Sequence, residues 1–312
     1  MAKGKWGTKD QAEKSSKFWG DKAETTEEVK AKKAEPKPKA VTIDEVGKWL
    51  MTTENPNGTS CILLYGSDGT GKSGISQATP LRGKGKMVIF DLDRSNMPIW
   101  EAYHNCDPNL IIKDPVVMGF DEDGNYTIDY LATMNRIKAS LIWVKDNHEK
   151  HNVTVVVLDG LNKLLKYAEY QMRIDANVQV DGGVSMRYWI RRSKAFMEIL
   201  EVLKGLPVHK IYVAHEDFQV KEGEAAAAVK ANTNQLMDVK CFLERKDYDD
   251  QIEFYGTVDK HKSNSAFEGK EILFMTVDKK TGQSTWDSDE MWSVLGWRPD
   301  TQTQKPKPKK KK

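Results

Sequence analysis

The sequence predicts an α/β fold with a mostly parallel central sheet, helices on both faces and an antiparallel C-terminal strand extension. Short apolar runs alternate with helical patterns, as in strands joined by crossover helices. The run 153–160 is rich in β-branched residues, is apolar from Val155 to Leu158 and ends in Asp159-Gly160, as expected for a parallel strand covered on both faces. Later segments instead alternate with period two, which indicates antiparallel strands. The predicted parallel strands are 61–65, 86–93, 110–112, 153–160 and 209–215, and the antiparallel ones are 239–243, 252–258 and 272–277.

Two long helices are predicted between these strands. The segment 128–148 carries an apolar stripe of Leu131, Met134, Ile137, Leu141 and Val144. On this pattern we expect one face of the helix to pack on the sheet. The segment 184–203 carries a second stripe, and it predicts that Trp189 is a core residue rather than a base-stacking platform. The residues of this stripe are Met186, Trp189, Ile190, Met197, Leu200 and Leu203.

Composition limits the classes of protein to consider. The chain has 312 residues, of which 39% are hydrophobic and 30% charged, enough for a sizeable core. A net charge of +2 means that any argument for nucleic acid must rest on local patches. The apolar runs are too short to span a membrane and no leader peptide is visible, so we expect a cytoplasmic protein with no membrane partner. We expect Cys61, Cys106 and Cys241 to be reduced core thiols without a zinc site.

Charged segments of low apolar content flank the central region. Residues 1–40 are rich in Lys, Glu and Ala, and residues 299–312 end in a run of lysines. Both are predicted to be disordered tails, which leaves 41–298 as the folded domain. Trp6, Phe18 and Trp19 in the first tail either dock on another subunit or protein or have no fixed role.

The segment 66–73 fits the phosphate-binding pattern G-x-x-x-x-G-K-[ST] at every position. An apolar strand precedes it and a helical segment follows it, which argues against the alternative of a chance glycine-rich turn. Backbone N–H groups of such a loop face a phosphate, Lys72 reaches the β- and γ-phosphates, and the Ser73 hydroxyl ligates Mg²⁺. The predicted nucleotide-binding residues in and beside the loop are Gly66, Ser67, Asp68, Gly69, Thr70, Gly71, Lys72, Ser73 and Gly74.

Polar side chains end three other predicted parallel strands: Asp93, Asp159 and His215. Ligands of open α/β sheets bind at the carboxyl ends of the strands, so we expect these residues beside the loop. Asp159 is expected to hold Mg²⁺ directly or through water. The next residue is Gly160, where many ring-forming ATPases and helicases have a catalytic Glu. Asp93 is therefore the candidate base that orients water, the alternative being that Asp91 and Asp93 only cap the strand.

The order of these motifs resembles the RecA superfamily of recombinase ATPases, over about residues 55–280. Asp91-Leu92-Asp93 followed by Pro98-Ile99-Trp100 looks like the Asp-x-Glu and Pro-Ile-Tyr segments of bacterial RecA. The resemblance implies that Asp93 is the catalytic base and that Trp100 stacks on adenine. Aspartate in place of glutamate shortens the reach by one methylene group.

The same resemblance implies roles for two further positions. His215 matches the strand-end residue that senses the γ-phosphate. Lys260 and Lys262, in Lys260-His261-Lys262, match a cationic pair that reaches the ATP of the adjacent subunit. A solvated basic turn is the alternative interpretation of this tripeptide.

The resemblance is strongest to compact RecA/RadA-like ATPases of phages and archaeal viruses. It implies a Mg²⁺-dependent ATPase that oligomerises on single-stranded DNA as a filament or hexameric ring, in recombination, repair or annealing. A single-strand-binding protein or replication protein is a further expected partner. The implied DNA-binding loops are 175–187 and 217–236, with Arg187 and Lys230 as the nearest cations. A replicative helicase, a genome-packaging motor and a nucleotide-gated assembly protein are the alternatives.

Overall fold

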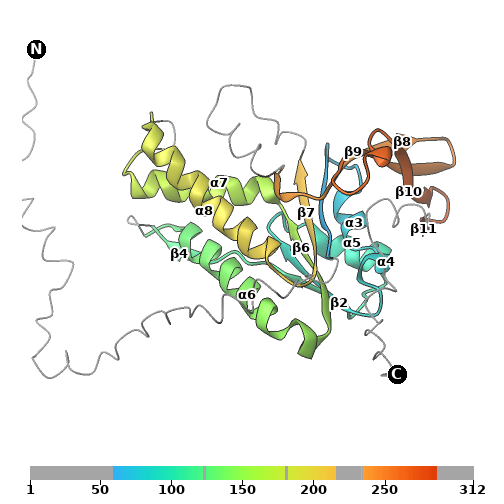
Figure 1. The fold of residues 1–312 in the computed structure, drawn as a ribbon, viewed down its shortest axis with the longest axis horizontal. Coiled ribbons are helices and arrows are strands. Elements are labelled where there is room, and N and C mark those ends of the chain that lie inside the picture. Colours follow the sequence, from blue (N-terminus) through green and yellow to red (C-terminus); the bar gives the residue numbers. More distant parts are fainter. Residues whose placement is uncertain (1–58, 122–123, 180–181, 216–232, 234, 287–312) are drawn as a thin grey trace, which may run out of the picture. The chain divides into compact units, whose positions relative to one another are not determined.

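Nine strands form one sheet in the part of the chain that this computed structural model describes, which is residues 59–121, 124–179, 182–215, 233 and 235–286. The strand order is β11-β10-β9-β8-β1-β7-β6-β2-β3 (Figure 1). The predicted tails 1–40 and 299–312, most of the loop 217–236 and its cation Lys230 lie outside the described residues.

Neighbouring strands at the centre of the sheet run parallel. In spatial order they are β3 (Leu110–Lys113), β2 (Lys86–Asp91), β6 (Val153–Asp159), β7 (His209–His215), β1 (Cys61–Gly66) and β8 (Val239–Asp247). From β8 outward the pairing is antiparallel, through β9 (Gln251–His261), β10 (Glu271–Asp278) and β11 (Ser284–Trp286). The predicted fold class is therefore confirmed, including the antiparallel C-terminal extension.

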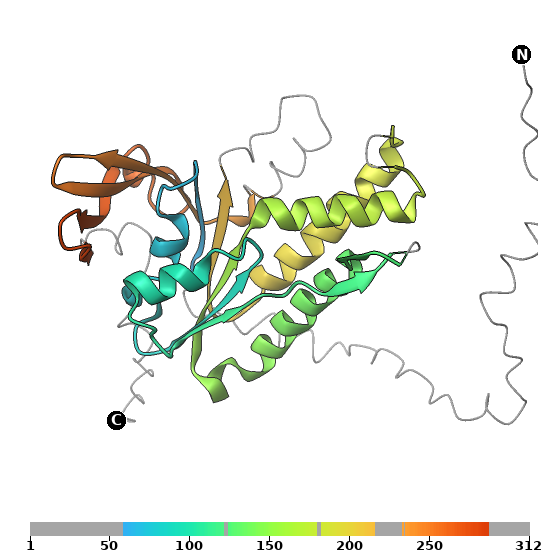
Figure 2. The same cartoon turned by 180° about the vertical axis from the view of Figure 1, so that it is seen from behind.

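Helices cover both faces of this sheet, as the two views show (Figures 1 and 2). One face carries three long helices, and the other carries shorter helices around the phosphate loop. The long ones are α6 (Tyr130–His151), α7 (Leu161–Asp175) and α8 (Met186–Lys204), and the short ones are α3 (Lys72–Ser76), α4 (Thr79–Arg82) and α5 (Asn96–Tyr103).

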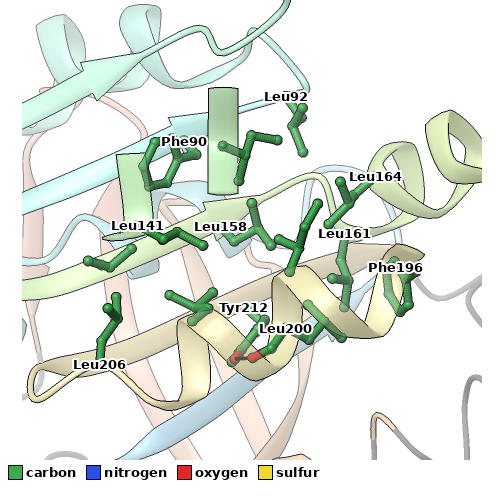
Figure 3. Close-up of a cluster of buried hydrophobic side chains, with 14 of the residues drawn as sticks. Phe90, Leu92, Leu141, Leu158, Leu161, Leu164, Phe196, Leu200, Leu206 and Tyr212 are labelled. Carbon is green, nitrogen blue, oxygen red and sulfur yellow. Dashed lines mark hydrogen bonds between the residues drawn. The ribbon is translucent and has the colours of Figure 1, made fainter. Parts of the chain in front are cut away.

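Alternate residues of the parallel strands enter two different cores. In β6, Val156 and Leu158 pack under the long helices, whereas Val155 and Val157 pack under the short ones. Both sets are fully buried, which explains the continuous apolar run that predicted a two-sided parallel strand. Figure 3 shows the first core between the sheet and the long helices, with Phe90, Leu158, Leu161, Leu164, Phe196, Leu200 and Tyr212 labelled.

Parts of the predicted helix stripes are wrong. Leu131, near the start of α6, is 50% exposed, and Met186 and Ile190 of α8 are more than 60% exposed. Trp189 is half-buried, with the guanidinium carbon of Arg192 4.5 Å from its ring centroid. The first turns of α8 do not reach the sheet, and the buried residues begin further along, at Arg192, Phe196, Ile199, Leu200 and Leu203.

Local details also differ from the sequence prediction. A two-stranded hairpin, β4 (Met118–Phe120) and β5 (Tyr126–Ile128), was not predicted from the sequence. Cys61 and Cys241 are buried as expected, but Cys106 is exposed in the turn that follows α5. A 3₁₀ turn (Ser265–Phe267) follows β9. None of the described helices has the length and hydropathy that crossing a membrane requires.

We predict that burial of His209 makes the fold acid-sensitive. Its Nδ1 accepts the backbone N–H of Ser60 at 3.1 Å, and burial, with a smaller contribution from Lys210, lowers the pKa of His209 from 6.5 to about 4. Between these values the unfolded chain binds more protons than the folded one. The free energy of unfolding therefore falls as pH drops from about 6.5 to about 4, by roughly 3 kcal/mol at most.

Urea unfolding from pH 7.5 to pH 4.5 measures this dependence. The variant His209→Gln should lose less stability on acidification than the wild type does, whereas His148→Gln, on the partly exposed surface of α6, should behave as the wild type. Equal slopes in wild type and His209→Gln would contradict the assignment.

Candidate nucleotide site

A cavity of about 570 Å³ lies at the carboxyl ends of β1, β6 and β7. This volume is in the range of small-molecule sites. Residues of the phosphate loop, the strand ends and the C-terminal extension line it together. The structure thus brings Lys72, Asp93, Asp159 and His215 into one pocket, although they lie far apart in the sequence.

The phosphate loop connects β1 to α3 and is held by its own side chains. Lys72 Nζ donates to the carbonyl oxygens of Gly66 (3.0 Å) and Ser67, and the Thr70 hydroxyl donates to Ser67 O at 2.9 Å. Gly71 has φ 78°, and a Cβ there would lie 2.7 Å from a ring carbon of Phe254. Glycine is therefore required at this position, both for the backbone conformation and for the close approach of β9.

Asp159 ends β6 as a buried carboxylate, only 1% exposed. It accepts a hydrogen bond from Asn96 Nδ2 at 2.8 Å and another from the Ser73 hydroxyl. Burial raises the pKa of Asp159 to about 6, although these two donors lower it; the nearby Asp93 and Asp91 raise it further. A carboxylate beside a hydroxyl, with like charges around it, is a donor set that fits Mg²⁺. Ser73 and Asp159 are thus placed as the predicted metal ligands would be.

Asn96 connects Asp159 to the rest of the site and was not found from the sequence. It is fully buried; besides Asp159, its Nδ2 donates to Asp91 Oδ1 (2.8 Å), and its Oδ1 accepts from Gln77 Nε2 (2.7 Å). Asp91 also accepts the backbone N–H groups of Ser95 and Asn96 at the start of α5. Asp91 therefore caps the start of α5.

Asp93 lies directly beside Gly160. The φ angle of Gly160 is 100°, and a Cβ there would lie 2.9 Å from Leu92 Cβ and 3.1 Å from Asp93 Oδ1. A glutamate after Asp159 is thus excluded by sterics, and the Asp93 carboxylate occupies the adjacent space. This carboxylate is 16% exposed and lies 3.2 Å from Lys163 Nζ.

His215 links two carboxylates across the pocket. Its Nδ1 is 2.8 Å from Asp68 Oδ1 of the phosphate loop, and its Nε2 is 3.5 Å from Asp93 Oδ2. Its backbone N–H donates to Asn162 Oδ1 at 2.9 Å, which fixes the strand end against α7. The strand end, the loop and the candidate base are therefore in direct contact.

Trp100 does not line the cavity, contrary to the role implied by the resemblance. Its indole N–H donates to Asp107 O at 2.9 Å, and the ring packs against the core under the short helices. Adjacent side chains of a helix point about 100° apart, so other residues of α5 face the site instead. The apolar wall of the cavity is formed by Ile99, Tyr103, Phe254, Met275 and Val277.

Lys260 and Lys262 lie near the amino-terminal end of β8, whereas the pocket of the same chain lies at the carboxyl ends of the parallel strands. Lys260 and His261 are inside β9, where His261 pairs with Val239 at the start of β8. Lys262 lies 3.5 Å from Asp238 through Nζ. The turn is therefore partly an ion-paired strand end, and any contact of this pair with ATP has to be with that of another subunit.

Three further cations are Arg187, which was predicted, and Lys163 and Arg245, which were not. Arg187 is exposed on α8, with its guanidinium carbon 4.9 Å from the ring centroid of Tyr188. Lys163 of α7 and Arg245 of β8 both line the pocket, and neither was predicted. Lys163 lies in the first turn of α7, directly after the strand that ends at Asp159, a position that could have indicated it. Arg245 has no such local signal.

Comparison with known proteins gives likeness of fold only. The sequence matches no protein-family model and no curated protein. Among solved structures, the KaiC-like protein PH0186 from Pyrococcus horikoshii OT3 is similar at 12% identity and a TM-score of 0.39, over 70% of this chain and 85% of that one. The flagellar accessory protein FlaH from Methanocaldococcus jannaschii is similar at 14% identity and a TM-score of 0.40, over 75% and 91%.

We predict that Asn96→Ala destabilises the fold by about 2–4 kcal/mol. The substitution removes one hydrogen bond each from Gln77, Asp91 and Asp159, all of them buried, and loss of a partner by a buried polar group is costly. Urea denaturation at pH 7.5 measures the change. As a control, Asn147→Ala removes an amide that donates to Trp143 O on the surface of α6, and it should cost about 0.5 kcal/mol or less. Equal losses in the two variants would refute a central role for Asn96.

Proposed function

We propose that this protein is a Mg²⁺-dependent ATPase that hydrolyses ATP at the phosphate loop. The observation that carries the proposal is the meeting of Lys72, Ser73, Asp159 and Asp93 in one cavity. The loop pattern is specific for nucleoside triphosphates. The strand-end carboxylates supply a metal ligand, Asp159, and a general base, Asp93, which hydrolysis requires.

Each residue has a distinct role in the proposed reaction. Lys72 neutralises charge on the β- and γ-phosphates, and Ser73 and Asp159 hold the metal. Mg²⁺, when bound, offsets the charge that develops on the phosphate oxygens. Asp93 accepts a proton from the water that attacks the γ-phosphorus, while the bond to the bridging oxygen breaks and ADP leaves.

The contacts of Asp93 support its assignment as the base. Because Gly160 has no side chain, the Asp93 carboxylate approaches the Asp159 strand end closely. This close approach compensates for a side chain one methylene shorter than glutamate. Lys163 and His215 contact the two carboxylate oxygens and orient the group, which leaves it partly accessible to water.

The ATPase is further proposed to assemble as a homo-oligomer on single-stranded DNA. The support is the family resemblance of the motif order and the distance of Lys260 and Lys262 from their own pocket. Arg187 and Arg191, both exposed on α8 and both next to the Tyr188 ring, offer a cationic and aromatic surface. Such surfaces suit single-stranded nucleic acid, which is bound by charge and by stacking.

We predict that Asp93→Asn abolishes hydrolysis but not binding. The amide cannot accept the proton, so phosphate release should fall about 10²- to 10⁴-fold, while the Kd for ATP stays within a few-fold of wild type. Phosphate release with Mg²⁺, and with the metal chelated, measures turnover and its metal dependence.

The matched control is Asp114→Asn, which removes a carboxylate of an exposed ion pair with Arg94. It should hydrolyse ATP at the wild-type rate. Wild-type turnover by Asp93→Asn would exclude this residue as the base, and absence of any turnover in the wild type would overturn the ATPase proposal.

We predict that the ATPase rate rises more steeply than linearly with protein concentration, and more so with single-stranded DNA. Lys262→Ala should restore linearity because the trans contact is lost, whereas Lys145→Ala, on the exposed face of α6, should not. Rates at increasing protein concentration test this. If no single-stranded DNA binds at low salt with ATP present, the DNA proposal is wrong; unwinding of a forked duplex would instead indicate a helicase.

A further inference from the structure

The C-terminal extension lies directly on the phosphate loop of the same chain. A Cβ on Gly66 would lie 2.4 Å from Leu243 O of β8, and one on Gly71 would meet Phe254 of β9. Met275 and Val277 of β10 also line the cavity. The extension is therefore one wall of the nucleotide site and supplies its residues in cis.

Arg245 is the cation that this wall presents to the cavity. In β8, Cys241 and Leu243 are buried against the core that contains α3, and Arg245 continues the same face beyond the core. Its neighbour Lys246 faces the other way, where it pairs with Glu271 and lies 4.0 Å over the Tyr255 ring. The strand pattern thus directs Arg245, and not Lys246, to the loop.

Asp247 fixes the orientation of the Arg245 side chain. Its two carboxylate oxygens accept Nε and Nη2 of Arg245, each at 2.9 Å, in a bidentate pair. The remaining terminal nitrogen, Nη1, lies 4.0 Å from the position of a Cβ on Gly69. Lys279 lies 3.7 Å from Asp247 on the side of β10. Asp247 therefore occupies one edge of the guanidinium, and Nη1 points toward Gly69 at the tip of the phosphate loop.

The cavity is lined by several carboxylates, so a polyphosphate bound there needs further positive charge beside it. Asp68, Asp93 and Asp159 line it beside Lys72 and Lys163, and Lys163 is already held by Asp93 and the carbonyl of Leu92. A polyphosphate adds further negative charge, and a planar guanidinium is well suited to bind it. Arg245 lines the same cavity with part of its fork fixed in advance, which lowers the entropy lost on binding.

We propose that Arg245 binds the polyphosphate of the nucleotide in cis and that Asp247 is its positioning residue. The inference rests on the proposed ATPase function and adds a residue to it. It separates two sources of positive charge in the site: Arg245 from the same chain, and Lys260 and Lys262 from a neighbour. A cation from the same chain contributes to nucleotide binding at any protein concentration, including concentrations too low for subunits to assemble.

Nucleotide affinity tests the proposal first. Titration of a fluorescent ATP analogue with Mg²⁺, at a protein concentration low enough to favour monomers, should show a Kd about 10- to 100-fold weaker for Arg245→Ala. Arg245→Lys should recover part of the loss, since the charge is kept but the fork is not. Asp247→Asn should give a smaller loss, and its Kd should depend on salt as in the wild type, because Arg245 is still present. Lys246→Ala, which faces away from the loop, should bind as the wild type does.

Mixing of two impaired variants distinguishes a contribution in cis from one in trans. Lys72→Ala retains Arg245 but lacks a working loop, and Arg245→Ala has a working loop. If Arg245 acts in cis, their mixture hydrolyses ATP no faster than Arg245→Ala alone at the same total protein concentration. A mixture that regains activity, or wild-type affinity in Arg245→Ala, would overturn the inference. A wild type that neither binds nor hydrolyses ATP would instead refute the proposed function itself.

Discussion

The buried carboxylate of Asp159 is the group on which the arrangement of the site depends. A charge that is 1% exposed is stable only where hydrogen bonds or a metal ion compensate for lost water. Ser73 and Asn96 provide the hydrogen bonds, and Asn96 is held in turn by Gln77 and Asp91. Because Asp91 also caps α5, one buried network fixes the phosphate loop, two strand ends and a helix start relative to one another.

The second constraint is the position of β8 at the boundary between the parallel and the antiparallel parts of the sheet. It pairs parallel with β1 and antiparallel with β9, so the extension is continuous with the strand that leads into the phosphate loop. The parallel half supplies Asp159, the candidate metal ligand, and Asp93, the candidate base. The antiparallel half supplies the apolar wall and Arg245. Neither half alone lines the whole cavity.

The fold class and the strand-end residues could be predicted because they depend on local patterns. Apolar runs define the strands, and parallel strands place their carboxyl ends together. Features that depend on orientation or register could not. Trp100 and Tyr103 are on one short helix, and which of them faces the cavity depends on its rotation. Asn96 is an ordinary polar residue until three distant elements converge on it, and Arg245 reaches the loop only through the pairing of β8 with β1.

The two ends of the antiparallel pair β8 and β9 carry different functional groups. The phosphate loop lies at one end of this pair and Lys262 at the other, and nine residues of β8 separate the ends by roughly 25–30 Å. A twofold axis that sets the β8–β9 pairs of two copies antiparallel would place the lysine pair of each copy at the loop of the other, and such an assembly closes as a dimer. Copies that meet head to tail through these opposite ends instead repeat in one sense. Such contacts are heterologous, and their rotation per subunit alone determines whether the assembly closes or extends.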